Sequence, residues 1–183
     1  MKTIKRSMHI ITLLLVGSLV IAQTGMDVKV LKDQFALNSK TFNNVLVNIS
    51  DKDANRRIAG TNSVKWIAGH TVDTGYNLAA ILGVSSENPY AADFGFGKPF
   101  DPNADYPSLK KMLADWNALS PKIEAAIGKL TQGQLSADPP FPLPYNEQSI
   151  RGLLSFQMHH ISYEVGQLGL YRRFLGKAPL SYQ

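Results

Sequence analysis

A histidine and a glutamate stand four residues apart near the end of the chain, at His160 and Glu164. The surrounding apolar residues recur at helical spacing, so the two side chains share one inward face of a predicted helix. Buried polar groups need partners. The two residues can form a simple hydrogen-bonded pair, or they can supply two ligands to a metal ion. His159 lies about a hundred degrees around the helix and is predicted to be exposed.

His70 is the candidate third ligand. It shares a helical face with Trp66 and Thr74 on a predicted helix in the first half of the chain. In an antiparallel bundle this face can meet His160 and Glu164 across the core. Two neutral imidazoles and one carboxylate, with open positions for water or substrate, are typical of catalytic zinc sites and of non-haem iron sites. The alternative is that each histidine is an ordinary core residue with a hydrogen-bond partner.

Four helices are predicted to position these residues, and no strand pattern or repeat competes with them. The predicted spans are residues 31–49, 62 or 63 to 82, 106–130 and 146–175. Pro107 suits a first helical position, and Pro121 predicts a kink or a break in the third helix. Asn146 is the expected cap of the fourth helix. The predicted fold class is therefore all-α, a four-helix bundle.

Two connections are long. Residues 84–106 carry five aromatic side chains among glycines and prolines. A connection of this length without regular structure is uncommon in a compact domain and is often functional. It can pack down as a lid, or it can be a plain crossover whose aromatics form a side cluster. Residues 132–145 are predicted to be a linker, and its proline-rich part, residues 138–144, is expected to lie extended on the surface.

Three basic residues and then an apolar run, residues 10–21, open the chain. This pattern is typical of a signal peptide, because the run is too short to cross a bilayer comfortably. Cleavage after Ala22 is expected, which leaves residues 23–183 as one domain without a membrane anchor. The protein is therefore expected to be exported to the periplasm or the extracellular space. The alternative is an uncleaved N-terminal anchor.

The composition excludes several kinds of partner and cofactor. The chain carries 19 basic and 14 acidic residues, a net charge of +5. Without the three basic residues of the signal peptide, 16 basic residues remain against 14 acidic ones, a net charge of +2. No basic run is present, so no nucleic-acid partner is expected. The chain has no cysteine, which excludes disulfides, cysteine-ligated metals and c-type haem.

Two motifs together resemble those of the DinB-like superfamily. The last helix of that family reads H-x-x-x-H-x-G-Q-L-x-x-x-R-R-x-x-G. The matching residues here are His160, Glu164 at the second histidine position, Gly166-Gln167-Leu168, Arg172-Arg173 and Gly176. The run from Trp66 to His70 resembles the second-helix motif W-x-x-x-H, which precedes a Leu-Gly stop, here Leu82-Gly83. The resemblance covers nearly all of the mature chain in element order and spacing.

The resemblance implies a four-helix bundle, often dimeric, with a divalent metal held by three inward ligands. In this chain those ligands are His70, His160 and Glu164, and a homodimer is expected. Family members include thiol-dependent transferases and isomerases and metal-dependent hydrolases. Because thiol cosubstrates are mainly cytosolic, a hydrolase or another transferase acting on a small molecule fits an exported protein better. A carboxylate at residue 164 favours harder ions, so Zn, Fe or Mn is expected.

Three further residues are candidates for orienting the ligands or a substrate. Asp73, three residues after His70, is placed to receive the free N–H of its imidazole. Gln157 and Gln167 lie along the same helix as His160 and Glu164. Each of the three can equally be a polar residue at a helix edge. The alternative to a metalloenzyme is a bundle that has lost metal binding and is a non-catalytic small-molecule-binding or structural protein.

Overall fold

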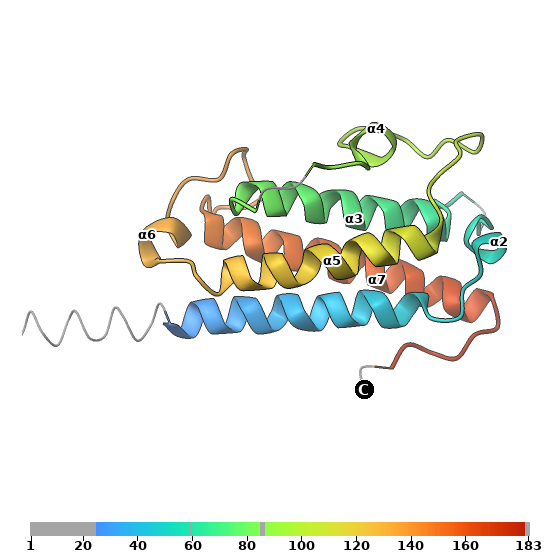
Figure 1. The fold of residues 1–183 in the computed structure, drawn as a ribbon, viewed down its shortest axis with the longest axis horizontal. Coiled ribbons are helices and arrows are strands. Elements are labelled where there is room, and N and C mark those ends of the chain that lie inside the picture. The colour runs from blue at the N-terminus through green and yellow to red at the C-terminus, as the bar shows by residue number, and fades with distance from the viewer. Residues whose placement is uncertain (1–24, 59, 85–86, 182–183) are drawn as a thin grey trace, which may run out of the picture.

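Four long helices form the body of the molecule (Figure 1). The computed structural model describes residues 25–58, 60–84 and 87–181, and helices are the only regular structure within them. The long helices are the N-terminal helix, whose described part covers residues 25–46, α3 (Val64–Ile81), α5 (Leu109–Ile127) and α7 (Ile150–Phe174). The all-α prediction is confirmed. The predicted signal peptide, residues 1–22, lies outside the described residues.

The apolar faces of these helices meet in one core. Phe35 and Phe42 of the N-terminal helix pack against Trp116 of α5, with ring centroids 6.1 and 5.1 Å apart. The indole N–H of Trp116 donates a hydrogen bond to Ser39 Oγ at 3.0 Å. Burial of a large aromatic residue with its polar atom satisfied is strongly stabilising. This core fixes the relative positions of the helices that carry the candidate ligands.

The ends of α3 agree with the sequence prediction to within two residues. The Ser63 side chain accepts a hydrogen bond from the backbone N–H of Trp66 and so caps the first turn. At the other end Gly83 follows the C-cap Leu82 with φ +74°, a conformation that glycine adopts without strain. The caps therefore set the register of the helix that carries His70.

Two helix starts differ from the prediction. The N-cap of α7 is Ser149 rather than Asn146, because the Ser149 side chain accepts from the backbone N–H of Gly152. Pro107 precedes the N-cap Ser108 of α5 instead of occupying its first turn. Pro121 does not end α5, which continues to Ile127 with buried apolar residues on both sides of the proline. Burial of that face outweighs the backbone hydrogen bond that proline removes.

Three short helices lie in the connections. They are α2 (Asp51–Ala54), α4 (Ala91–Phe94) and α6 (Gln132–Leu135). The sequence predicted irregular structure at all three places. Local caps explain α2 and α6: Ser50 caps α2, and Thr131 forms a reciprocal capping box with Gln134 in α6. Among the described residues no helix combines the length and apolar character needed to cross a membrane.

Candidate metal centre

Polar contacts show that α3 and α7 run antiparallel, as Figure 1 also shows. Near the start of α3, the Tyr171 hydroxyl donates to the carbonyl oxygen of Asn62 at 2.5 Å. Further along α3, Gln157 Nε2 donates to Thr74 Oγ1 at 3.1 Å. The register between these two contacts places the middle of α3 against the middle of α7. His70 and His160 lie in that middle section.

His70, His160 and Glu164 come together there, with one possible ligand atom from each lying within 4.8 Å of the others. The two imidazole centroids are 5.0 Å apart, and the ring planes meet at 83°. His160 Nε2 lies 3.4 Å from Glu164 Oε1. Ligands of one ion at Zn–N and Zn–O distances lie roughly 3–4 Å from each other. The pair on α7 already has this spacing, and the possible ligand atom of His70 lies within 4.8 Å of both.

His70 is held by a backbone carbonyl and by an indole. Its Nδ1 lies 3.2 Å from the carbonyl oxygen of Phe94 in α4. The Trp66 indole stacks on the imidazole, with centroids 4.9 Å apart and planes 16° from parallel. Because a carbonyl only accepts, the hydrogen bond places the proton on Nδ1 and leaves Nε2 with a free lone pair. Histidines that bind metals commonly use this arrangement.

Glu164 is buried, with 5 % of its surface exposed. Its Oε2 accepts a hydrogen bond from Gln167 Nε2 at 2.6 Å, while Oε1 lies on the His160 side. Within the described part of the chain, neither lysine nor arginine forms an ion pair with this carboxylate. A buried carboxylate without a cationic partner is costly. A divalent cation beside the two imidazoles would balance the charge.

Asp73 does not occupy the position that the sequence predicted. Its buried carboxylate accepts hydrogen bonds from Asn88 Nδ2 at 2.8 Å and from Asn77 Nδ2 at 3.2 Å. It therefore holds the connection after α3 and is not the group that receives the N–H of His70. The Phe94 carbonyl has that position instead. Sequence reasoning missed it because a backbone oxygen 24 residues away leaves no pattern in side-chain types.

The two glutamines have different surroundings. Gln167 contacts a candidate ligand directly, through its hydrogen bond to Glu164. Gln157 is buried and donates a hydrogen bond to Thr74. Gln157 lies about one helical turn from His160 on α7, and Thr74 lies about one turn from His70 on α3. Gln157 borders the centre without a hydrogen bond to any of the three candidate ligands. His159 is exposed, as the helical phase predicted.

The described part of the connection after α3, residues 87–106, packs down on the bundle, and Figure 1 shows α4 lying over α3. Tyr90 donates a hydrogen bond to Asp115 Oδ2 of α5 at 2.6 Å. Phe94 is fully buried and packs against Tyr106, with centroids 5.0 Å apart. The aromatics thus form a cluster that also brings the Phe94 carbonyl to His70. The connection is part of the centre's surroundings.

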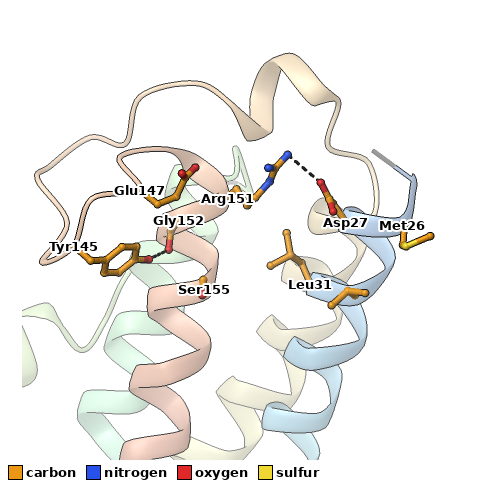
Figure 2. A pocket seen from close by; sticks show the side chains of 9 residues that line it. Met26, Asp27, Leu31, Tyr145, Glu147, Arg151, Gly152 and Ser155 are labelled. Carbon is orange, nitrogen blue, oxygen red and sulfur yellow. Dashed lines mark hydrogen bonds and ion pairs between the residues drawn. The ribbon is translucent and has the colours of Figure 1, made fainter. Parts of the chain in front are cut away.

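A separate hollow of about 410 Å³ lies between the first residues of the N-terminal helix and the start of α7 (Figure 2). Arg151 and Asp27 form an ion pair across it at 3.0 Å. Tyr145 lies at its edge, with its hydroxyl bonded to the carbonyl of Gly152. None of the three candidate ligands lines this hollow, so it is distinct from the centre.

The comparison with protein families agrees with the motifs. The sequence model of the DinB superfamily matches residues 34–168, a span that includes all three candidate ligands and more than half of the chain. A comparison with curated proteins found no match. The extent of the family match is sufficient to assign membership. This chain therefore belongs to the DinB superfamily.

Proposed function

We propose that this protein binds one divalent ion through His70, His160 and Glu164 and acts as a metal-dependent hydrolase or transferase on a small molecule. The convergence of these three side chains from two antiparallel helices carries the proposal. The donor set suits Zn, Fe or Mn, because it mixes imidazole nitrogen with a carboxylate oxygen. Three protein ligands also leave coordination positions open.

The surrounding residues orient the ligands before any ion binds. The Phe94 carbonyl fixes the His70 tautomer, and Gln167 holds one oxygen of Glu164. Trp66 stacks on the face of the His70 ring. When bound, a divalent ion supplies Lewis acidity toward a substrate oxygen.

Metal analysis of the purified protein tests this proposal. The wild type, loaded separately with Zn²⁺, Mn²⁺ or Fe²⁺ and then desalted, is expected to retain a stoichiometric ion. His160→Ala is expected to lose it, because one of three ligands is gone. His159→Ala is the matched control, because His159 is adjacent to His160 on the same helix and its imidazole is exposed. A wild type that retains none of the three ions would contradict the proposal and favour a non-catalytic bundle.

We propose further that the mature protein works outside the cytoplasm. The basic and apolar pattern of residues 1–22 supports export. Expression of the full chain followed by mass spectrometry of the exported fraction tests it. The expected product begins at Gln23, whereas retention of the intact chain in the membrane fraction would support an uncleaved anchor.

We propose also that the protein is a homodimer. Exposed apolar side chains on two adjacent helices support this: Leu37 on the N-terminal helix, with 50 % exposed, and Tyr163 and Leu170 on α7, each with 61 % exposed. A hydrogen bond of 3.1 Å from Ser162 Oγ to Asn38 Oδ1 joins the two helices beside Leu37 and Tyr163, and Leu170 lies about two helical turns further along α7. A second copy packed on this surface would bury them.

A further inference from the structure

Tyr90 is the residue before α4, and its side chain is anchored on α5, away from the helix that α4 covers. Its hydroxyl donates a hydrogen bond to Asp115 Oδ2 at 2.6 Å, and the residue is 1 % exposed. Burial raises the pKa of the hydroxyl, and the hydrogen bond to Asp115 raises it further. The hydroxyl therefore keeps its proton and remains a donor at neutral pH. This contact ties the start of α4 to α5.

The single turn of α4 connects this anchor to His70. The carbonyl oxygen of Tyr90 accepts a hydrogen bond from the backbone N–H of Phe94 at 2.9 Å. The carbonyl oxygen of Phe94 lies 3.2 Å from Nδ1 of His70. Each step from the Asp115 carboxylate to the imidazole is thus either a hydrogen bond or the covalent structure of one residue. A contiguous chain of this kind can carry energetic coupling between distant groups.

Aromatic packing makes the turn stiff. The centroid of the Tyr90 ring lies 6.0 Å from that of Phe94 and 5.9 Å from that of Tyr76 on α3. Phe94 is itself fully buried. Close-packed buried side chains transmit a displacement to their neighbours instead of absorbing it. A shift of Tyr90 is therefore expected to move the Phe94 carbonyl with it.

The hydrogen bond to His70 and the binding of an ion favour each other. The Phe94 carbonyl holds the proton on Nδ1, which leaves the lone pair of Nε2 for a cation. A cation on Nε2 makes the Nδ1–H a stronger donor. Because linkage is reciprocal, a change that weakens the contact between Phe94 and His70 also weakens ion binding.

We propose that Tyr90 is a positioning residue for His70, which it orients through α4 by means of its hydrogen bond to Asp115. It acts through the Phe94 carbonyl and is not itself a ligand. The inference deepens the proposed metal function and rests on it. It gives α5, which supplies none of the three candidate ligands, an influence on the affinity of the centre.

Zinc affinity, measured by competition with a chromophoric chelator, tests the inference. Tyr90→Phe keeps the buried ring but lacks the donor. Zinc is expected to bind roughly 2- to 30-fold more weakly, the range for substitutions that act on a distant site through a packed network. Lys111→Met is the matched control, because it removes the other hydrogen bond to Asp115 Oδ2 and leaves that of Tyr90. Its zinc affinity is expected to equal that of the wild type.

A second measurement needs no ion. At mildly alkaline pH, where imidazoles are neutral, nitrogen nuclear magnetic resonance shifts of the His70 ring report which nitrogen carries the proton. The metal-free wild type and Lys111→Met are expected to hold it on Nδ1. In Tyr90→Phe both shifts are expected to move toward the values of exchanging tautomers. A general loss of stability would not change the tautomer of one imidazole.

Three results would each overturn the inference: equal zinc affinities of the wild type and Tyr90→Phe, an equal loss of affinity in Lys111→Met, or unchanged His70 shifts in Tyr90→Phe. A wild type that binds no zinc would refute the proposed metal function. The shifts of the metal-free protein would then still decide whether Tyr90 positions His70.

Discussion

The ring of Phe94 lies against the backbone of Gly69, in the space that a Cβ atom at residue 69 would occupy. This close approach seats α4 on α3. It also brings the Phe94 carbonyl to 3.2 Å from Nδ1 of His70, the next residue along α3. The orientation of a candidate ligand therefore depends on the absence of a side chain one residue before it.

Replacement of this glycine should disturb the centre. In Gly69→Ala the added methyl group overlaps the Phe94 ring, so we expect a loss of about 1–3 kcal/mol in the free energy of unfolding. We also expect weaker zinc binding, because α4 must move away from His70. Urea denaturation and calorimetric titration measure the two effects. Gly133→Ala is the control, since a Cβ there meets open space, and equal behaviour of both variants would contradict the prediction.

Removal of the hydrogen bond to Glu164 should lower metal affinity. Gln167→Met retains the length of the side chain but loses the donor to Oε2. We expect zinc affinity to fall roughly 10- to 100-fold, as when other partners of metal ligands are removed. Competition with a chromophoric chelator measures the change. Gln34→Met, at an exposed position of the N-terminal helix, is the control, and wild-type affinity in Gln167→Met would rule out an orienting role.

The contact that ties α4 to α5 should weaken in acid. Burial raises the pKa of the Asp115 carboxyl, but hydrogen bonds from Lys111 and Tyr90 outweigh it and hold the pKa below its ordinary value of 3.8. A lowered folded-state pKa stabilises the fold above the unfolded-state value, and that stabilisation is lost as pH falls through the folded-state pKa. Stability of the wild type should therefore fall more steeply below about pH 4 than that of Asp115→Asn.

Urea denaturation at several pH values checks this expectation. Tyr90→Phe removes one of the two donors and should give an intermediate slope. Parallel pH profiles for the wild type and Asp115→Asn would show that the carboxylate contributes no pH-dependent stability.

A buried arginine joins the end of the N-terminal helix to α7. Arg172 Nη1 donates to the carbonyl oxygens of Val45 and Val47 at 3.0 and 2.6 Å, and Nε donates to that of Ala178 at 3.0 Å. Arg172→Met leaves these carbonyls without their charged donor, and we expect a loss of about 2–4 kcal/mol in unfolding free energy. Arg173→Met is the matched control, because Arg173 is exposed and should change stability by less than about 0.5 kcal/mol. Similar losses in both variants would contradict the assignment.

A charge placed in the proposed dimer surface should change the mass of the protein in solution. Leu170→Glu places a charge among the exposed apolar residues of α7, so we expect monomers where the wild type is dimeric. Light scattering coupled to size-exclusion chromatography measures the mass. Phe96→Glu is the control, because Phe96 is fully exposed and belongs to neither helix of the proposed dimer surface. A monomeric wild type would refute the dimer.

Helical phase and capping residues explain what the sequence could predict. Ser63 and Gly83 delimit α3, and spacing on α7 places His160 and Glu164 inward, so helical spacing together with the family resemblance singled out the three candidate ligands. The start of α7 was less predictable, because Asn146 and Ser149 are both good caps. Local hydrogen bonds decide between them: the Gln148 side chain bonds back to the Leu143 backbone and holds the preceding residues outside the helix.

The surroundings of the ligands were harder to predict than the ligands. Asp73 has the right spacing from His70, yet its carboxylate holds Asn88 and Asn77. The spacing of residues also cannot predict that the Trp66 N–H is unpaired, because this depends on whether any neighbouring element places an acceptor beside it. Such features depend on contacts across the fold, which a one-dimensional pattern does not contain.

The acceptor that fixes His70 is a main-chain oxygen, an atom that every amino acid carries. No substitution at residue 94 deletes this atom, so the side chain there acts on the ligand's orientation only through the packing that seats α4 on α3. The orientation depends also on the path of the backbone between α3 and α5. Insertions or deletions in that connection would therefore change the orientation of His70 while all three ligands stay unchanged. Proteins of this fold can thus differ in the chemistry of the centre through the length of this connection alone.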